Sequence, residues 1–252
     1  MNTPSTPMQT HQIPGPGTFS FSAVRIDDLG ATEYTLVTVV VDTTGSVQAF
    51  ANELLDCVRR IVEACRRTPR SENLLLRLLT FNTELHEVHG FKPLSEIDPA
   101  AYKPFRPTGM TALFDAAYSG IGATLEMAKR LHAQGFEVNG CVYIVTDGMD
   151  NASTLTPKAI ADRTSQAASA EEIASLTTVL VGLIDPAESS APEVRNALTT
   201  FEVDAGLSRF IDAGDATPRR LAALARFVSR SISSHSVALS AGGAAAPVPL
   251  TF

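Results

Sequence analysis

The sequence predicts an α/β fold, a doubly wound and mostly parallel sheet with helices on both faces. Short apolar runs rich in β-branched residues alternate along the chain with longer stretches of helical periodicity. Two of these runs, 35–41 and 141–145, are apolar almost throughout, as strands buried on both faces are. Strands that alternate with helices are joined by right-handed crossovers, and this connection builds a parallel sheet.

In the N-terminal half, residues 19–26 alternate between apolar and polar side chains, and a turn at 27–30 leads into the first core strand. We therefore expect an extra N-terminal edge hairpin. The predicted elements that follow are a core strand at 35–41, a helix at 47–65, a buried strand at 74–81 and a more polar strand at 85–91. The polar strand is expected to pair antiparallel at an edge of the sheet.

The C-terminal half repeats the scheme. Its predicted elements are helices at 113–132, 157–174, 192–199 and 218–232, and strands at 141–145, 177–184 and 209–212. Gly135 is expected to stop the first of these helices, because glycine readily adopts the left-handed conformation that ends helices.

Length and composition favour one domain with a tail at each end. The chain has 252 residues, of which 44% are hydrophobic and 19% charged, enough for one substantial core. We expect the domain to span residues 18–236. Residues 1–17, rich in Pro, Thr and Gln, are predicted to be a disordered tail, and residues 237–252 a flexible one. No apolar run is long enough to span a membrane, and the N-terminus lacks an export signal.

Charge and cysteine content narrow the function classes. A net charge of −7 argues against a general nucleic-acid binder. Cys57, Cys65 and Cys141 form no Cys-x-x-Cys pair and fall on predicted apolar faces. They are expected to be reduced, buried thiols in a cytoplasmic protein.

Oxygen-bearing side chains follow or open predicted elements at three separate places. Asp42, Thr44 and Ser46 come directly after the first core strand. Thr111 precedes the long helix, and Asp147 follows the central strand. In a doubly wound sheet, ligands bind at the carboxyl ends of the strands, and Mg²⁺ prefers oxygen ligands. We therefore predict a metal site at this edge, where Asp147 acts through a bound water.

From residue 35 to residue 232, the element order and these five positions resemble the von Willebrand factor A domain family. The metal-ion-dependent adhesion site of that family uses an Asp-x-Ser-x-Ser loop, a distant Thr and a distant Asp. Asp42, Thr44 and Ser46 match the loop, Thr111 matches the distant Thr, and Asp147 matches the distant Asp. Thr44 stands where the pattern has serine, and it keeps a hydroxyl at the same reach.

The resemblance implies a Rossmann-like fold and a metal site that holds Mg²⁺, with Mn²⁺ or Ca²⁺ as alternatives. It also implies that neither carboxylate need bind the ion directly, so the ion would keep positive character and attract an Asp or Glu of a partner. The chain would then be a protein-binding module of a bacterial cytoplasm and not an enzyme. An ATPase, kinase or other effector is the expected partner, whereas nucleic acids and membranes are not.

Other interpretations use the same residues. Ser46 and Thr111 are also common helix caps, and Asp147-Gly148 is a common turn pair. The stretch that begins at Asp42 resembles the Asp-Lys-Thr-Gly-Thr loop of haloacid-dehalogenase-like phosphotransferases, in which Asp42 would be the nucleophile. Thr43 replaces the lysine of that loop, and the interpretation leaves Thr111 without a role.

A third, minor hypothesis is RNA binding, which some members of the von Willebrand A family show. Five arginines concentrate positive charge around the end of the first predicted helix: Arg59, Arg60, Arg66, Arg67 and Arg70. A solvated helix end, where cations also suit the helix dipole, explains them as well.

Overall fold

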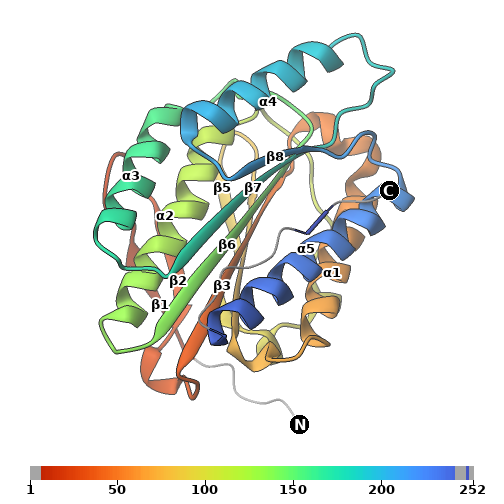
Figure 1. Ribbon diagram of the computed structural model, residues 1–252. Helices are drawn as coiled ribbons and strands as arrows, with labels where there is room; N and C mark the ends of the chain where they lie inside the picture. Colours follow the sequence, from red (N-terminus) through yellow and green to blue (C-terminus); the bar gives the residue numbers. More distant parts are fainter. Residues whose placement is uncertain (1–6, 242–247, 250–252) are drawn as a thin grey trace.

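The structure, a computed structural model, describes residues 7–241, 248 and 249. Within these residues, one sheet of eight strands runs in the order β1-β2-β5-β4-β3-β6-β7-β8 (Figure 1). The strands are β1 (Met8–Gln12), β2 (Ser20–Val24), β3 (Glu33–Asp42), β4 (Leu74–Phe81), β5 (Leu85–Pro93), β6 (Glu137–Thr146), β7 (Ser175–Gly182) and β8 (Arg209–Asp212). The α-helices are α1 (Ala51–Arg66), α2 (Leu113–His132), α3 (Pro157–Ser169), α4 (Ala191–Ala205) and α5 (Pro218–Ser240).

The topology confirms the predicted doubly wound α/β fold. β3 pairs in parallel with both β4 and β6, and β7 and β8 continue the parallel sheet. From β3 the chain first builds outward through β4 and β5, and after α2 it returns to the other side of β3 as β6. The strand order therefore reverses between β3 and β6, and this is the point where doubly wound sheets bind ligands.

Helices cover both faces of the sheet: α2, α3 and α4 lie on one face, and α1 and α5 lie on the other (Figure 1). Along β3, Leu36 and Val40 belong to the core under α2, whereas Val37, Val39 and Val41 belong to the core under α1 and α5. Alternate residues of a strand point to opposite faces. A strand covered on both faces is therefore apolar at nearly every position, as the sequence indicated.

The N-terminal hairpin differs from its prediction. β1 and β2 form an antiparallel hairpin, but it lies beside β5 rather than beside the first core strand. β5 is antiparallel to β4, as predicted, but it is not the edge strand. The expected disorder over residues 1–17 is wrong for β1, whereas residues 1–6 lie outside the described part. Ile13 and Phe21 bury themselves in the core under α2, and these long-range contacts order a segment of disorder-like composition.

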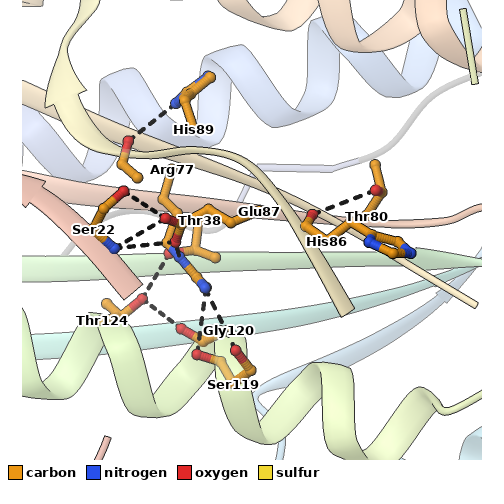
Figure 2. Close-up of polar contacts among 11 residues, drawn as sticks. Ser22, Thr38, Arg77, Thr80, His86, Glu87, His89, Ser119, Gly120 and Thr124 are labelled. Carbon is orange, nitrogen blue, oxygen red and sulfur yellow. Dashed lines mark hydrogen bonds and ion pairs between the residues drawn. The ribbon is translucent and has the colours of Figure 1, made fainter. Parts of the chain in front are cut away.

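Side chains fasten this hairpin to the sheet (Figure 2). The backbone register between β2 and β5 contains one pair of residues, Ala23 and Phe91. Arg77 of β4, 1% exposed, donates from Nε to Oε2 of Glu87 at 2.7 Å. The backbone N–H of Ser22 in β2 donates to Oε1 of the same carboxylate at 2.9 Å. Glu87 therefore links three strands and holds the charge of a buried guanidinium.

Some helix boundaries also differ from the pattern. α1 begins at Ala51, after a 3₁₀ turn over Gly45–Phe50, and α3 ends at Ser169, ahead of the left-handed Glu171 (φ 53°). α5 continues to Ser240, so residues 237–240 are helical rather than part of a flexible tail. Residues 242–247 and 250–252 of that predicted tail lie outside the described residues.

The structure also bears on membrane-spanning helices and on the state of the cysteines. Across the described ranges, no helix combines the length and apolar character that crossing a membrane requires. Cys57, Cys65 and Cys141 are buried and unpaired with one another, and burial raises the pKa of each thiol to about 12. The cysteines are therefore unreactive small hydrophobic side chains in the core.

Candidate metal centre

Asp42, the last residue of β3, is 1% exposed, and both of its carboxylate oxygens accept hydrogen bonds. The backbone N–H of Thr44 donates to Oδ1 at 2.8 Å, and the hydroxyl of Thr146 at the end of β6 donates to Oδ2 at 2.6 Å. A buried carboxylate requires such partners. Asp42 is therefore held in one orientation by two neighbouring strands.

A chain of polar contacts continues from this carboxylate to Asp147. The hydroxyls of Thr44 and Ser46 lie 3.0 Å apart, and the Ser46 hydroxyl donates to Oδ1 of Asp147 at 2.9 Å. Asp42, Thr44, Ser46 and Asp147 thus form one connected group at the carboxyl ends of the neighbouring strands β3 and β6. The structure brings these four predicted residues together.

Thr111 lies on the loop that precedes α2, close to the turn after Asp147. Its backbone N–H donates to Oδ1 of Asn151 at 2.7 Å, and its carbonyl accepts from the backbone N–H of Asn151 at 2.9 Å. A Cβ atom built on Gly148 would lie 3.9 Å from the Thr111 hydroxyl oxygen, so this hydroxyl lies beside the turn that follows Asp147. The described residues provide no hydrogen-bond partner for that hydroxyl, which leaves it available as a ligand.

The loop before α2 is also tied to the β3 loop. The backbone N–H of Thr108 donates to the carbonyl of Thr43 at 3.1 Å, and that of Gly45 donates to the carbonyl of Gly109 at 3.5 Å. Gly109 has a φ of +76°, and a Cβ there would lie 2.6 Å from the Thr83 hydroxyl oxygen. This position therefore requires glycine. The tight turn keeps the segment that carries Thr111 beside the β3 loop.

The electrostatics of the group favour a bound cation. Burial raises the pKa of Asp42, although its hydrogen bonds from Thr146 and Thr44 oppose the shift. Burial first, and then the nearby charge of Asp42, raise the pKa of Asp147 to about 6. Across the described part of the chain, neither carboxylate has a Lys, Arg or His partner in an ion pair. A dication at this point would relieve the repulsion between the two carboxylates.

The donor set fits Mg²⁺ better than a softer metal. It consists of the hydroxyls of Thr44, Ser46 and Thr111 and the carboxylates of Asp42 and Asp147. No group of three or more His, Cys, Asp or Glu side chains suited to a metal ion occurs among residues 7–241, 248 and 249. Hard oxygen donors with few charges suit Mg²⁺, Mn²⁺ or Ca²⁺ and not Zn²⁺.

Two residues of the group escaped the sequence analysis. Thr146 orients Asp42, and Asn151 orients Thr111. The sequence held a usable signal for Thr146, because it ends an apolar strand beside Asp147. No local pattern indicated that Asn151 would contact Thr111. Asp150 accepts from the backbone N–H of Phe114 at 3.2 Å, so it caps α2 rather than serving the group.

The two alternative functions find less support in this geometry. Asp42 is nearly inaccessible and both of its oxygens are engaged, which is unfavourable for a nucleophile that must attack a phosphate. Of the arginines near the end of α1, Arg59 bonds to Asp56 and to the carbonyl of Tyr102, and Arg70 pairs with Glu33. These contacts reduce the charge available for RNA.

No family model matches the chain, and no curated protein matches it. Solved structures do. The vWF domain of the type V pili tip protein Mfa5 from Porphyromonas gingivalis is 14% identical with a TM-score of 0.52, and the match covers 87% of this chain and 99% of that domain. The chain has a von Willebrand A-like fold.

Two longer proteins contain a similar fold. A mutant of the PilB minor pilin from Streptococcus sanguinis is 12% identical with a TM-score of 0.58, and the match covers 92% of this chain and 68% of the pilin. The pilus adhesin SpaC from Lactobacillus rhamnosus GG is 10% identical with a TM-score of 0.54, at 93% coverage of this chain. The chain spans about a third of that adhesin (36%). At such identities the likeness concerns the von Willebrand A-like fold alone.

Proposed function

We propose that this chain is a divalent-metal-dependent protein-binding module. In this proposal Asp42, Thr44, Ser46 and Thr111 hold Mg²⁺, Asp147 acts through a bound water, and an Asp or Glu of a partner protein completes the coordination. The observation that carries the proposal is the convergence of these side chains, from three separate parts of the chain, at the switch point of the sheet.

In this proposal the residues have different roles, which follow from their positions. Asp42 and Thr146 keep the β3 loop in register with β6, because their hydrogen bond joins the two strand ends. Thr44, Ser46 and Thr111 present neutral hydroxyls, so they leave a bound ion with net positive charge. When bound, Mg²⁺ would supply that charge to a carboxylate of the partner.

Binding, rather than catalysis, is the activity that this arrangement favours. The structural neighbours are a pilus tip protein domain, a minor pilin and a pilus adhesin. We therefore consider proteins of the cell surface as partners, besides the ATPases, kinases and other effectors that the sequence suggests. The cytoplasmic location stays a prediction. The partner search should therefore include extracts of both the cytoplasm and the cell surface.

The test compares Asp42→Asn with Asp185→Asn by calorimetric titration with Mg²⁺ and Mn²⁺. Asp185 follows β7 at the same edge of the sheet, and its exposed side chain accepts one backbone hydrogen bond, from Ala187, so it is a matched control. We expect Asp42→Asn to lose metal binding and Asp185→Asn to retain it. Equal metal binding by the two variants and the wild type would refute the assigned site.

The second part of the test is affinity capture from native extracts with wild type, Asp42→Asn and Asp185→Asn, each in Mg²⁺ or in EDTA. A protein retained by wild type and Asp185→Asn only in Mg²⁺ supports the proposed function. Retention of the same proteins in all conditions would show that recognition uses a metal-independent surface.

A further inference from the structure

A groove of about 1090 Å³ lies beside the candidate metal centre. β4, β5 and the segment 96–106 line it, and we call it the β4–β5 groove. Its volume is slightly above the roughly 300–1,000 Å³ typical of small-molecule pockets. It is therefore large enough for several residues of a peptide rather than for one side chain.

The groove borders the two loops that carry the metal centre. Thr43 and Thr108 both line it, and the backbone N–H of Thr108 donates to the carbonyl of Thr43 at 3.1 Å. Thr43 lies between Asp42 and Thr44 in the sequence, and Thr108 belongs to the loop that carries Thr111. A peptide whose carboxylate reaches the metal would therefore have its neighbouring residues at the entrance of the groove.

Part of the groove lining is apolar. Val88 of β5 and Pro104 are exposed there and Phe105 is partly exposed, whereas Leu78 and Tyr102 are buried residues of the groove wall. Val88 is 44% exposed, so a large part of its side chain can contact another molecule. An apolar surface of this kind indicates a site that a hydrophobic side chain of another molecule covers.

The charged lining is locally positive on an acidic protein. Lys92, Lys103 and Arg106 line the groove, and none of the three has an ion-pair partner among the described residues. Two acidic residues, Glu96 and Asp98, also line the groove, so cations outnumber anions there by one, and Asp98 accepts a hydrogen bond from the backbone N–H of Ala100. Since the whole chain has a net charge of −7, this local excess of cations favours an acidic ligand.

We infer that the β4–β5 groove binds the part of the partner protein next to its metal-bound acidic residue. The ligand is an extended peptide with one acidic residue for the metal, a hydrophobic or aromatic residue for the surface around Val88, and further acidic residues near Lys103 and Arg106. This inference rests on the proposed function. A single-stranded nucleic acid shares the negative charge, but the apolar lining and the acidic net charge favour a peptide.

The test is selection from a displayed library of short random peptides on the full chain in Mg²⁺, followed by affinity measurement on the enriched peptides. We expect each enriched peptide to contain an acidic residue and a hydrophobic one at a constant spacing. Lys103→Glu and Val88→Asp should each weaken peptide binding about tenfold or more while Mn²⁺ affinity stays unchanged. Arg230→Glu, an exposed charge reversal on α5, is the matched control and should bind like wild type.

The outcomes separate the groove from the metal. Peptides that require Mg²⁺ but bind Lys103→Glu and Val88→Asp normally would refute the groove and keep the proposed function. Peptides that depend on the groove but bind equally in EDTA would refute the proposed function. The inference is also refuted if no acidic peptide is enriched, or if a single-stranded oligonucleotide binds better than the peptides and displaces them. A thermal melt of each variant shows whether the fold is intact.

Discussion

The hydroxyl of Thr146 donates a hydrogen bond of 2.6 Å to Oδ2 of Asp42, across the two strands between which the sheet reverses its order. Asp42 ends β3, and Thr146 ends β6. The bond joins residues that are 104 positions apart in the sequence, and it orients the carboxylate on which the candidate metal centre depends.

Thr146→Val is expected to lower Mn²⁺ affinity about tenfold, because groups that orient metal ligands typically contribute 10- to 100-fold. It should also lower the free energy of unfolding by about 1–3 kcal/mol, since a buried carboxylate oxygen loses its donor. Calorimetric titration and urea unfolding measure the two effects.

The matched control is Thr43→Val. Thr43 is 5% exposed, and its hydroxyl donates to the carbonyl of Phe81 at 2.9 Å, whereas the carboxylate of Asp42 accepts from Thr44 and Thr146. This variant should lose stability but keep its metal affinity. If both variants lose metal affinity equally, the Thr146 hydroxyl has no specific role in the centre.

The stability of the metal-free protein should fall as the pH rises from about 4 to about 6. The carboxyl of Asp147 has a pKa of about 6 in the folded state, above its ordinary value of 3.8, so in this range the folded chain holds a proton that the unfolded chain has lost. The raised pKa of Asp42 acts in the same direction. Thermal melts in EDTA across this range test the effect, and Asp147→Asn should flatten it.

Mg²⁺ should raise the melting temperature more at pH 7 than at pH 5. At the lower pH the ion must displace a proton from Asp147, whereas at the higher pH this carboxylate is already charged. A stabilisation by Mg²⁺ that is equal at the two pH values would contradict a role for Asp147 at the metal.

Glu87→Ala is expected to reduce the free energy of unfolding by about 3 kcal/mol, because it leaves the buried guanidinium of Arg77 without its counter-charge. Asp27→Ala is the control: it breaks an ion pair with Arg25 in which both side chains are exposed, and it should change stability by less than about 0.5 kcal/mol. Urea unfolding of both variants makes the comparison. Equal effects would show that Glu87 does not fasten the hairpin.

Gly90→Ala should loosen the N-terminal hairpin. A Cβ at Gly90 would lie 1.8 Å from the carbonyl oxygen of Ser22 in β2, so the two strands would have to separate. Amide hydrogen exchange in β1 and β2 should increase. Gly30→Ala is the control, since a Cβ there meets no atom within 4 Å, and exchange in the hairpin should not change.

The core strands and the two-sided sheet were predictable because their signals are local. β3 is apolar at nearly every position since each of its faces meets a helix, and that pattern is visible in residues 35–41 alone. The proximity of Asp42, Thr44, Ser46 and Asp147 was predictable for a related reason: the carboxyl ends of parallel strands meet at one edge, so residues that follow such strands become neighbours.

The hairpin and the groove were not predictable in this way. β1 has the composition of a disordered segment, and its order comes from its pairing with β2 and from the burial of Ile13 and Phe21 in a core built by residues far along the chain. Val88 resembles any alternating residue of a polar strand, and the groove that it lines depends on how β4, β5 and the segment 96–106 pack together.

By itself, the sequence determined most of the strands and helices, their alternation and the order of the candidate oxygen ligands, because periodicity and strand-end position depend on neighbouring residues. Only the tertiary structure decided that Asp42 is buried and held by Thr146, that Asn151 positions Thr111, and that the groove begins at Thr43. These features depend on which distant segments pack together. That packing is set by how all the apolar residues of the chain bury themselves in one core.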